Sequence, residues 1–254
     1  MTALLEIQDV GVQFGGVRAL TNVGFSVATG EFLSLIGPNG AGKTTLVRGI
    51  TGVIRLQQGR IVFAGRDISA WPVHRRIRAG LAMTHQIVRP FHSMTVLDNV
   101  ALPAGHENIG NVVKALLRLN RSPARKKALE LLSLVEIVDV AHQSVRGLPL
   151  GVVKRLELAR ALALEPQLLL LDEPLAGLNS QEAARLADMI TGINRQGVTI
   201  MMIEHNLGEV LRVSRRLVVL DNGRKIADGD PDTVMADPVV RSAYVGKEKQ
   251  DAAP

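Results

Sequence analysis

The segment that most constrains the fold is a glycine-rich loop, GPNGAGKTT, at residues 37–45. A compact apolar run, EFLSLIG, leads into the loop, and a stretch of helical character, TTLVRGITGV, follows it. Glycines let consecutive backbone N–H groups turn inward, and the positive end of the following helix faces the same point. The spacing of Gly37, Gly42, Lys43 and Thr44 fits the pattern of a phosphate-binding loop. A glycine-rich turn that matches by chance is the alternative, and the position between strand and helix argues against it.

Each position of this loop has an expected role. Lys43 is long enough to reach the outer phosphates of a nucleotide, and the Thr44 hydroxyl can ligate Mg²⁺. The remaining positions expected to hold phosphate are Gly37, Pro38, Asn39, Gly40, Ala41, Gly42 and Thr45. The loop therefore predicts a nucleotide bound together with Mg²⁺.

A second motif places two carboxylates at the end of an apolar run, LLLLDEP, at residues 168–174. The ends of strands in parallel sheets are where ligands bind. We expect Asp172 to hold Mg²⁺ through its water shell and Glu173 to point at a water attacking the γ-phosphate. An acidic turn after a core strand is the alternative, which the neighbouring phosphate loop disfavours.

Apolar periodicity predicts the order of secondary structure. Short strands punctuated by glycines are expected before the loop and at residues 59–66, and helical spacing of apolar residues runs from about residue 87 to 164. Within that stretch, helices are expected at 112–120, 124–140 and 154–164. Strands and helices then alternate, and the sequence RLVVLDNGRKIADG reads as a hairpin with a tight Asn-Gly turn.

These elements predict an α/β fold. It has a P-loop NTPase core, a mostly parallel sheet with helices on both faces, an N-terminal antiparallel β part and an inserted α-helical subdomain. We expect a single nucleotide-binding domain over residues 1–254. Its core would comprise residues 1–86 and 165–254, including a C-terminal extension, and its helical lobe about residues 87–164.

Composition narrows the class of protein. The chain has 254 residues and no cysteine, which excludes disulfides and thiolate metal sites. Its formal charge is +6, but the basic residues are scattered apart from short clusters at 74–77 and 125–128, which we expect to be solvated helix faces. The first residues do not form a secretory signal, and the apolar runs are too short to cross a bilayer, so membrane contact is expected only through partners.

At this point the chain resembles the ABC ATPase family, and the resemblance covers nearly all of it. Phe14, Gln86, Asn179 and His205 fall where the family places, respectively, an aromatic that stacks on adenine, the Q-loop glutamine, the D-loop and the switch histidine. The resemblance implies that the nucleotide is ATP and that Gln86 senses both Mg²⁺ and the attacking water. On the residues alone, core packing for Phe14, a surface position for Gln86 and a structural role for His205 stay open.

One segment departs from the family pattern. The family reads L-S-G-G-Q where this chain reads LPLGV at 148–152. Pro149 replaces the serine whose hydroxyl would meet the γ-phosphate held by a partner subunit, and proline has neither that hydroxyl nor an N–H. Leu150 and Val152 also depart from the pattern. The resemblance implies that each ATP lies between the phosphate loop of one subunit and this segment of the other. Two identical copies would then have two impaired sites, so we expect a heterodimer with a sister ATPase.

Other segments are similar to the larger ATPase subunit of bacterial branched-chain (hydrophobic) amino acid importers. They are AGRDISAW, AGLAMTHQ, FHSMTVLDNV, AGLN, IEHNLGEV and RSAYVGK. The resemblance implies two membrane permeases, an external solute-binding protein and a peripheral location at the cytoplasmic face of the inner membrane. His85 departs from that group, which usually has an aromatic before the glutamine.

The sequence leaves several other classes of ATPase open. ATPases of lipopolysaccharide export and of urea or amide import are similar in sequence. ATPases that act on DNA share the motifs but separate them by a long coiled coil. This chain has no sustained heptad pattern that could form such a coiled coil. No nucleic acid partner is therefore expected. A purely regulatory nucleotide-binding module is disfavoured by the presence of both Glu173 and His205.

Overall fold

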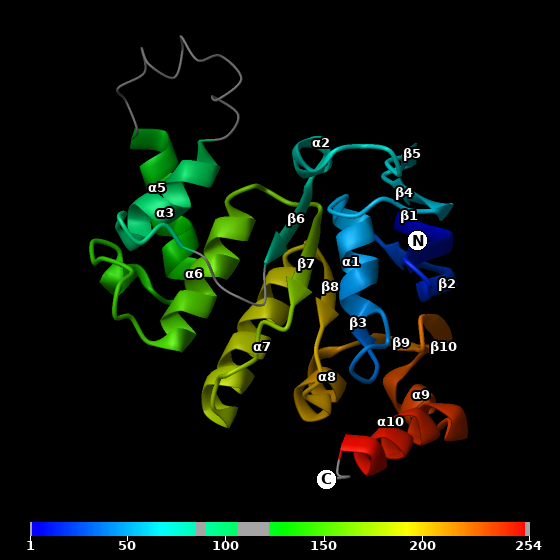
Figure 1. The fold of residues 1–254 in the computed structure, drawn as a ribbon. Helices are drawn as coiled ribbons and strands as arrows, with labels where there is room; N and C mark the ends of the chain where they lie inside the picture. Colours follow the sequence, from blue (N-terminus) through cyan, green and yellow to red (C-terminus); the bar gives the residue numbers. More distant parts are fainter. Residues whose placement is uncertain (1, 85–89, 106–121, 252–254) are drawn as a thin grey trace.

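Two β-sheets form the framework of the protein, as a computed structural model describes it over residues 2–84, 90–105 and 122–251 (Figure 1). The smaller sheet is antiparallel, with strand order β2-β1-β4-β5, and the larger has the order β10-β9-β3-β8-β7-β6. The strands are β1 (Ala3–Phe14), β2 (Val17–Ala28), β3 (Phe32–Ile36), β4 (Gln58–Phe63), β5 (Arg66–Asp67), β6 (Leu81–Thr84), β7 (Leu168–Asp172), β8 (Thr199–Ile203), β9 (Arg216–Asp221) and β10 (Arg224–Gly229).

The larger sheet is parallel from β9 to β6, and only β10 runs antiparallel, as the second strand of a hairpin. All five residues are buried in each of β3, β7 and β8. A strand buried on both faces must be covered on both sides, which is why these runs are apolar without alternation. The predicted α/β core with an N-terminal antiparallel part is confirmed.

Alternate side chains of the central strands enter two different hydrophobic clusters. Leu169 and Leu171 of β7 belong to one cluster, whereas Leu168 and Leu170 belong to the other. Since successive side chains of a strand point to opposite faces, the sheet separates the two clusters.

Helices cover both faces of this sheet. They are α1 (Lys43–Thr51), α2 (Val73–Arg78), α3 (Val96–Ala104), α5 (Ser122–Leu134), α6 (Leu150–Leu162), α7 (Ser180–Arg195), α8 (Leu207–Val213), α9 (Pro231–Ala236) and α10 (Pro238–Asp251). Leu46 and Ile50 of α1 enter one cluster, and Leu186 and Ile190 of α7 enter the other. The amphipathic spacing of these residues therefore places α1 and α7 on opposite faces.

Within the described residues, the inserted helical part contains α3, α5 and α6, which pack together beside the sheet (Figure 1). The helix expected at 124–140 ends earlier, at Leu134, because Glu136 adopts a left-handed φ of 55° and the Ile137 N–H turns back to Leu132 O. The helix α6 begins at Leu150, four residues before the expected start. The helix expected at 112–120 lies outside the described residues, and the division into lobes at residues 86/87 and 164/165 stays a prediction.

Arg76 corrects an expectation about the basic cluster at residues 74–77. It is buried rather than solvated, and its guanidinium donates hydrogen bonds of 2.7–2.9 Å to four backbone carbonyls. These carbonyls belong to Gly49, Ile50, Ser69 and Trp71. Two of them lie in the last turn of α1, where helix carbonyls lack partners within the helix. Arg76 therefore caps the helix that begins at the phosphate loop.

Replacing Arg76 with methionine is expected to lower the free energy of unfolding by about 3 kcal/mol, because buried carbonyls would lose their donor. Urea unfolding followed by circular dichroism measures this change. Arg78→Met is the matched control, since Arg78 is an exposed residue of the same helix. Equal stability of the two variants would contradict the capping role.

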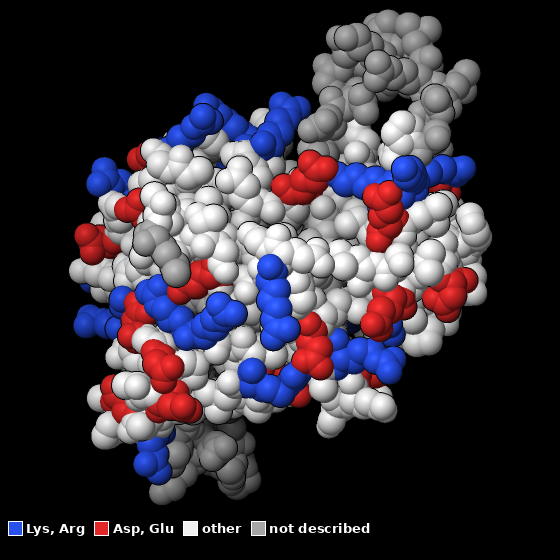
Figure 2. All heavy atoms as spheres, turned by 180° about the vertical axis from the view of Figure 1, so that it is seen from behind, with Lys and Arg blue, Asp and Glu red and all other residues white. Residues whose placement is uncertain are grey.

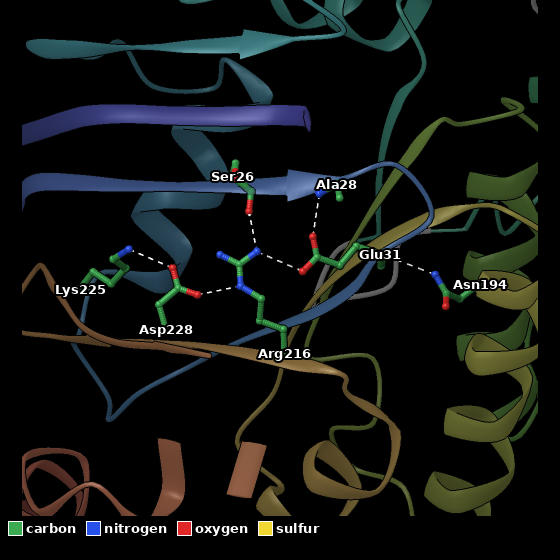
Figure 3. A network of polar contacts seen from close by, with 7 residues as sticks. All are labelled: Ser26, Ala28, Glu31, Asn194, Arg216, Lys225 and Asp228. Atoms are coloured by element: carbon green, nitrogen blue, oxygen red, sulfur yellow. Dashed lines mark hydrogen bonds and ion pairs between the residues drawn. The ribbon is translucent and has the colours of Figure 1, made fainter. Parts of the chain in front are cut away.

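A polar network ties the edges of the two sheets together (Figure 3). Arg216, at the start of β9, donates to Asp228 Oδ1 at 2.7 Å, to Glu31 Oε1 at 3.1 Å and to Ser26 O at 3.0 Å. Lys225 Nζ adds a contact of 2.9 Å to Asp228 Oδ2. Burial opposes ionisation of Asp228, but these two cations outweigh it and hold the pKa of its carboxyl below the ordinary value of 3.8.

The lowered pKa of Asp228 gives a pH-dependent contribution to stability. A depressed acid pKa stabilises the folded state above the unfolded pKa, and this contribution is lost as the pH falls through the lower folded pKa. We expect Asp228→Asn to be less stable than the wild type by on the order of 1 kcal/mol near neutral pH, with the gap narrowing by about pH 3. Urea unfolding at both pH values tests this, with the exposed Asp139→Asn as control. A gap independent of pH would refute it.

The surface shows no segregation of charge on the face seen in Figure 2, where basic and acidic side chains are interspersed. That agrees with their scatter along the sequence. Among the described residues, no helix combines the length and the apolar character needed to span a bilayer.

Candidate functional site

The phosphate loop leaves the central strand β3 and enters α1, as the sequence predicts. Gly37, Gly40 and Gly42 have positive φ values of 143°, 78° and 102°. A Cβ on Gly37 would lie 2.0 Å from Leu220 O, so only glycine fits there. These three glycines let the chain curl tightly, and α1 then begins at Lys43.

Lys43 folds its side chain back over this loop. Its Nζ donates to Gly37 O at 2.6 Å and to Pro38 O at 3.0 Å. The side chain is buried, which holds the ammonium at the entrance of the loop beside the N-terminus of α1. Both features attract a phosphate.

An open cavity of about 420 Å³ lies over the loop. Its lining consists of Val17, Arg18, Ala19, Asn39, Gly40, Ala41, Gly42, Lys43, Thr44, Thr45, Glu173, Asn222 and Gly223. The structure thus brings the carboxylate of Glu173 to the same cavity as Lys43 and Thr44, although they lie far apart in the sequence.

Part of this cavity was not expected from the sequence. The Asn222-Gly223 turn between β9 and β10 lines it, and the Gly223 N–H donates to Ala41 O at 3.1 Å. The Gly223 carbonyl in turn accepts from the Thr21 N–H at 2.8 Å. The Asn-Gly pair predicts the turn, but no local pattern reveals that the turn supports the phosphate loop.

The acidic strand end is held in an unusual conformation. Asp172 is the last residue of β7 and is buried. Glu173 has a left-handed φ of 49°, and its N–H donates to Ile203 O at 3.0 Å. A non-glycine residue keeps this conformation only where its surroundings enforce it, as happens at functional sites. The turn aims Glu173 at the cavity.

His205 lies beside this carboxylate. Its Nδ1 is 3.9 Å from Glu173 Oε1, and its side chain is 62% exposed. The neighbouring Glu204 is fully buried and belongs to the support of the site rather than to its surface. His205 thus lies next to the carboxylate of Glu173, and its predicted contact with the γ-phosphate stays a prediction.

The other positions singled out in the sequence have different outcomes. Phe14 is 53% exposed and pairs with Val17, a lining residue of the cavity, so it lies next to the site without lining it. Gln86 and His85 lie outside the described residues. Asn179 caps α7 through a reciprocal capping box with Glu182, which gives its side chain a structural task.

The divergent segment at 148–152 forms the start of α6. Pro149 is the N-cap residue, and proline has no side-chain group that can cap the helix. Leu150 is exposed, and its Cδ2 would be 2.9 Å from a Cβ on Gly177. The segment therefore presents an apolar side chain next to the loop before α7.

Comparisons with known proteins agree with this geometry. A family model described as "ABC transporter" matches residues 20–176, and one described as "Branched-chain amino acid ATP-binding cassette transporter" matches residues 224–249. The chain is 35% identical over 251 residues to the high-affinity branched-chain amino acid transport ATP-binding protein LivG of Salmonella typhimurium, covering 96% of this chain and 98% of the relative. The corresponding protein BraF of Pseudomonas aeruginosa gives the same identity and the same coverage.

Solved structures give the same result. The crystal structure of an ATP-binding cassette of an ABC transporter in its ADP conformation superimposes with a TM-score of 0.85 and 29% identity, covering 97% of this chain and all of the other. A nucleotide-free cassette from an ABC transporter gives a TM-score of 0.84 at 29% identity. The chain therefore belongs to the ABC transporter family as an ATP-binding subunit, an ATPase whose hydrolysis of ATP is coupled to transport.

Proposed function

We propose that the cavity over the phosphate loop is the site of MgATP hydrolysis and that this chain powers the import of branched-chain or other hydrophobic amino acids. The observation that carries the catalytic part is the single cavity shared by Lys43, Thr44 and Glu173. The observation that favours the substrate is the match of residues 224–249 to the branched-chain family model.

Binding in this cavity would use mainly backbone groups. The N–H groups of residues 37–45 and the Lys43 ammonium would hold the phosphates. Phe14, exposed beside Val17, would stack on the adenine.

Oxygen ligands of the site fit Mg²⁺. Thr44 supplies a hydroxyl in the cavity, and Asp172 supplies a carboxylate at the adjoining strand end. Mg²⁺ prefers one or two such protein ligands together with phosphate oxygens and water. When bound, it would neutralise charge that develops on the phosphates. Gln86 is proposed to join this group, although it lies outside the described residues.

Hydrolysis would then depend on the position of one water molecule. Glu173 would orient the attacking water, and His205 would contact the γ-phosphate from beside Glu173. Proton transfer to a positioned carboxylate and charge stabilisation by Lys43 supply the catalytic effect.

The divergent segment at 148–152 supports a pair of unlike ATPases. Pro149 cannot offer a hydroxyl or an N–H to a phosphate held by a second subunit. A sister ATPase that keeps the family pattern L-S-G-G-Q could contribute this segment to the nucleotide site of the present chain and so complete it. We therefore propose a heterodimer seated on two membrane permeases, at the cytoplasmic face of the inner membrane, with an external solute-binding protein delivering the cargo.

Co-purification and reconstitution test this proposal. The tagged chain, extracted from membranes in mild detergent, is expected to bring a second ATPase and two permeases with it. In proteoliposomes that also receive the binding protein, leucine uptake should require ATP. If urea, amides or lipopolysaccharide stimulated ATP hydrolysis by the complex and leucine did not, the proposed substrate would be wrong. Recovery of this chain as the sole ATPase of an active complex would refute the heterodimer.

A further inference from the structure

A lysine of α6, the helix that begins in the divergent segment, reaches into the catalytic region. Lys154 lies on α6, two residues beyond the divergent segment, and is only 7% exposed. Its Nζ donates a hydrogen bond of 3.1 Å to the backbone carbonyl of Glu173. Burying an ammonium group costs several kcal/mol unless polar groups compensate, so its position requires an explanation.

Acidic groups surround this ammonium and supply the compensation. Burial lowers the pKa of Lys154, while the carboxylates of Glu204, Glu173, Asp172 and Glu157 act in the opposite direction. Three of these four acids lie at or directly after the C-terminal ends of β7 and β8, namely Asp172, Glu173 and Glu204. The positive charge of Lys154 is thus compensated mainly by acids of the catalytic region and less by Glu157 of its own helix.

Glu204 is a second buried residue that holds the same region. It is 1% exposed, at the end of β8, and its carboxylate accepts the Leu175 N–H at 2.7 Å and the His205 N–H at 3.2 Å. Burial raises the pKa of this carboxyl, and the backbone donors counteract that rise. Glu204 therefore ties the chain that follows Glu173 to the segment carrying His205.

Together these contacts enclose the strained turn at Glu173. Its carbonyl is held by Lys154, its N–H by β8, and the residues that follow it by Glu204. The left-handed φ of 49° persists only if such contacts enforce it.

We propose that Lys154 and Glu204 are positioning residues of the ATPase site, which together fix the orientation of Glu173 and transmit the position of α6 to it. Neither residue is among those that line the cavity over the phosphate loop. Movement of α6 would shift the carbonyl of Glu173 through the hydrogen bond from Lys154. Docking of a partner on the helical part would in this way align the carboxylate of Glu173. This inference rests on the proposed catalytic role of Glu173.

Steady-state kinetics of the intact transporter complex test this inference. Lys154→Met keeps the length of the side chain and removes the charge and the donor. It is expected to lower kcat by about 10- to 100-fold, because small displacements of a catalytic group are costly, while KM for ATP changes less than about threefold. Lys154→Arg should restore most of kcat. Lys126→Met, on the exposed side of α5, is the matched control and should behave as the wild type.

A double-mutant cycle tests whether the two residues act as a unit. If they do, Lys154→Met combined with Glu204→Gln should lower kcat little more than the worse single variant, whereas independent residues would give multiplied losses. Multiplied losses, an unchanged kcat in Lys154→Met, or failure of Lys154→Arg to restore activity would each overturn the inference.

Two further measurements separate this inference from its alternatives. Affinity of the isolated full-length variants for a fluorescent ATP analogue reports folding of the site, so loss of binding in parallel with kcat would overturn a positioning role. The catalytic role of Glu173 is tested independently by its own variant. If Glu173→Gln hydrolyses ATP normally, the proposed function fails; if only Lys154→Met is normal, this inference fails alone.

Discussion

Glu173→Gln is expected to lower the turnover number of ATP hydrolysis by about 1000-fold while MgATP stays bound. Glutamine has nearly the same shape as glutamate but cannot accept a proton from the attacking water. The carboxylate of Glu173 lies in the cavity of the phosphate loop, and the left-handed turn that aims it is made by the backbone. The substitution therefore removes the chemistry and leaves the binding surface in place.

Single-turnover hydrolysis and filter binding of labelled ATP by the intact complex measure the two effects separately. Glu130→Gln is the matched control, because Glu130 is an exposed residue of α5. Turnover of Glu173→Gln at the wild-type rate would show that another group activates the water, and the assigned mechanism would be wrong.

Lys43→Ala is expected to weaken the binding of MgATP by about 100-fold, because charge-assisted hydrogen bonds to phosphate are the strongest single contacts such a loop provides. In the structure the ammonium is held at the mouth of the loop by the carbonyls of Gly37 and Pro38. These contacts place it where the outer phosphates would lie.

Isothermal titration of the isolated chain with MgATP measures this loss. Lys126→Ala serves as the control for removal of an exposed lysine, and far-UV circular dichroism shows whether the fold is kept. Unchanged affinity in a folded Lys43→Ala variant would contradict the assignment of the phosphate site.

The predictions from sequence succeeded where the physical constraint is local. The loop at 37–45 needs its glycines and lysine at fixed spacing, and short, mostly apolar runs suffice to identify the buried strands β3, β7 and β8. The end of such a run also marks the position of Asp172 and Glu173, whose roles in catalysis stay a prediction.

The residues missed by sequence reasoning depend on contacts between distant segments. Arg76 looks like one member of a basic surface cluster, and only the fold shows that it meets the end of α1. Lys154 and Glu204 occupy unremarkable positions in a helix and after a strand, yet Lys154 contacts the carbonyl of Glu173 and Glu204 contacts the N–H of Leu175, two residues further on. No periodicity encodes such meetings, because the residues are brought together by the crossover connections of the parallel sheet.

The strand order of the larger sheet has a consequence for synthesis on the ribosome. Strand β3, which carries the phosphate loop, lies between β8 and β9, and the turn that supports the loop is Asn222-Gly223. The loop thus emerges early, but the strands on either side of β3 are translated much later. Non-local pairing of this kind slows folding and leaves apolar strands without partners in the meantime. The nascent chain can acquire its nucleotide pocket only after residue 223 has been translated and has left the exit tunnel, so a shortened product of this gene would carry the motif without the site.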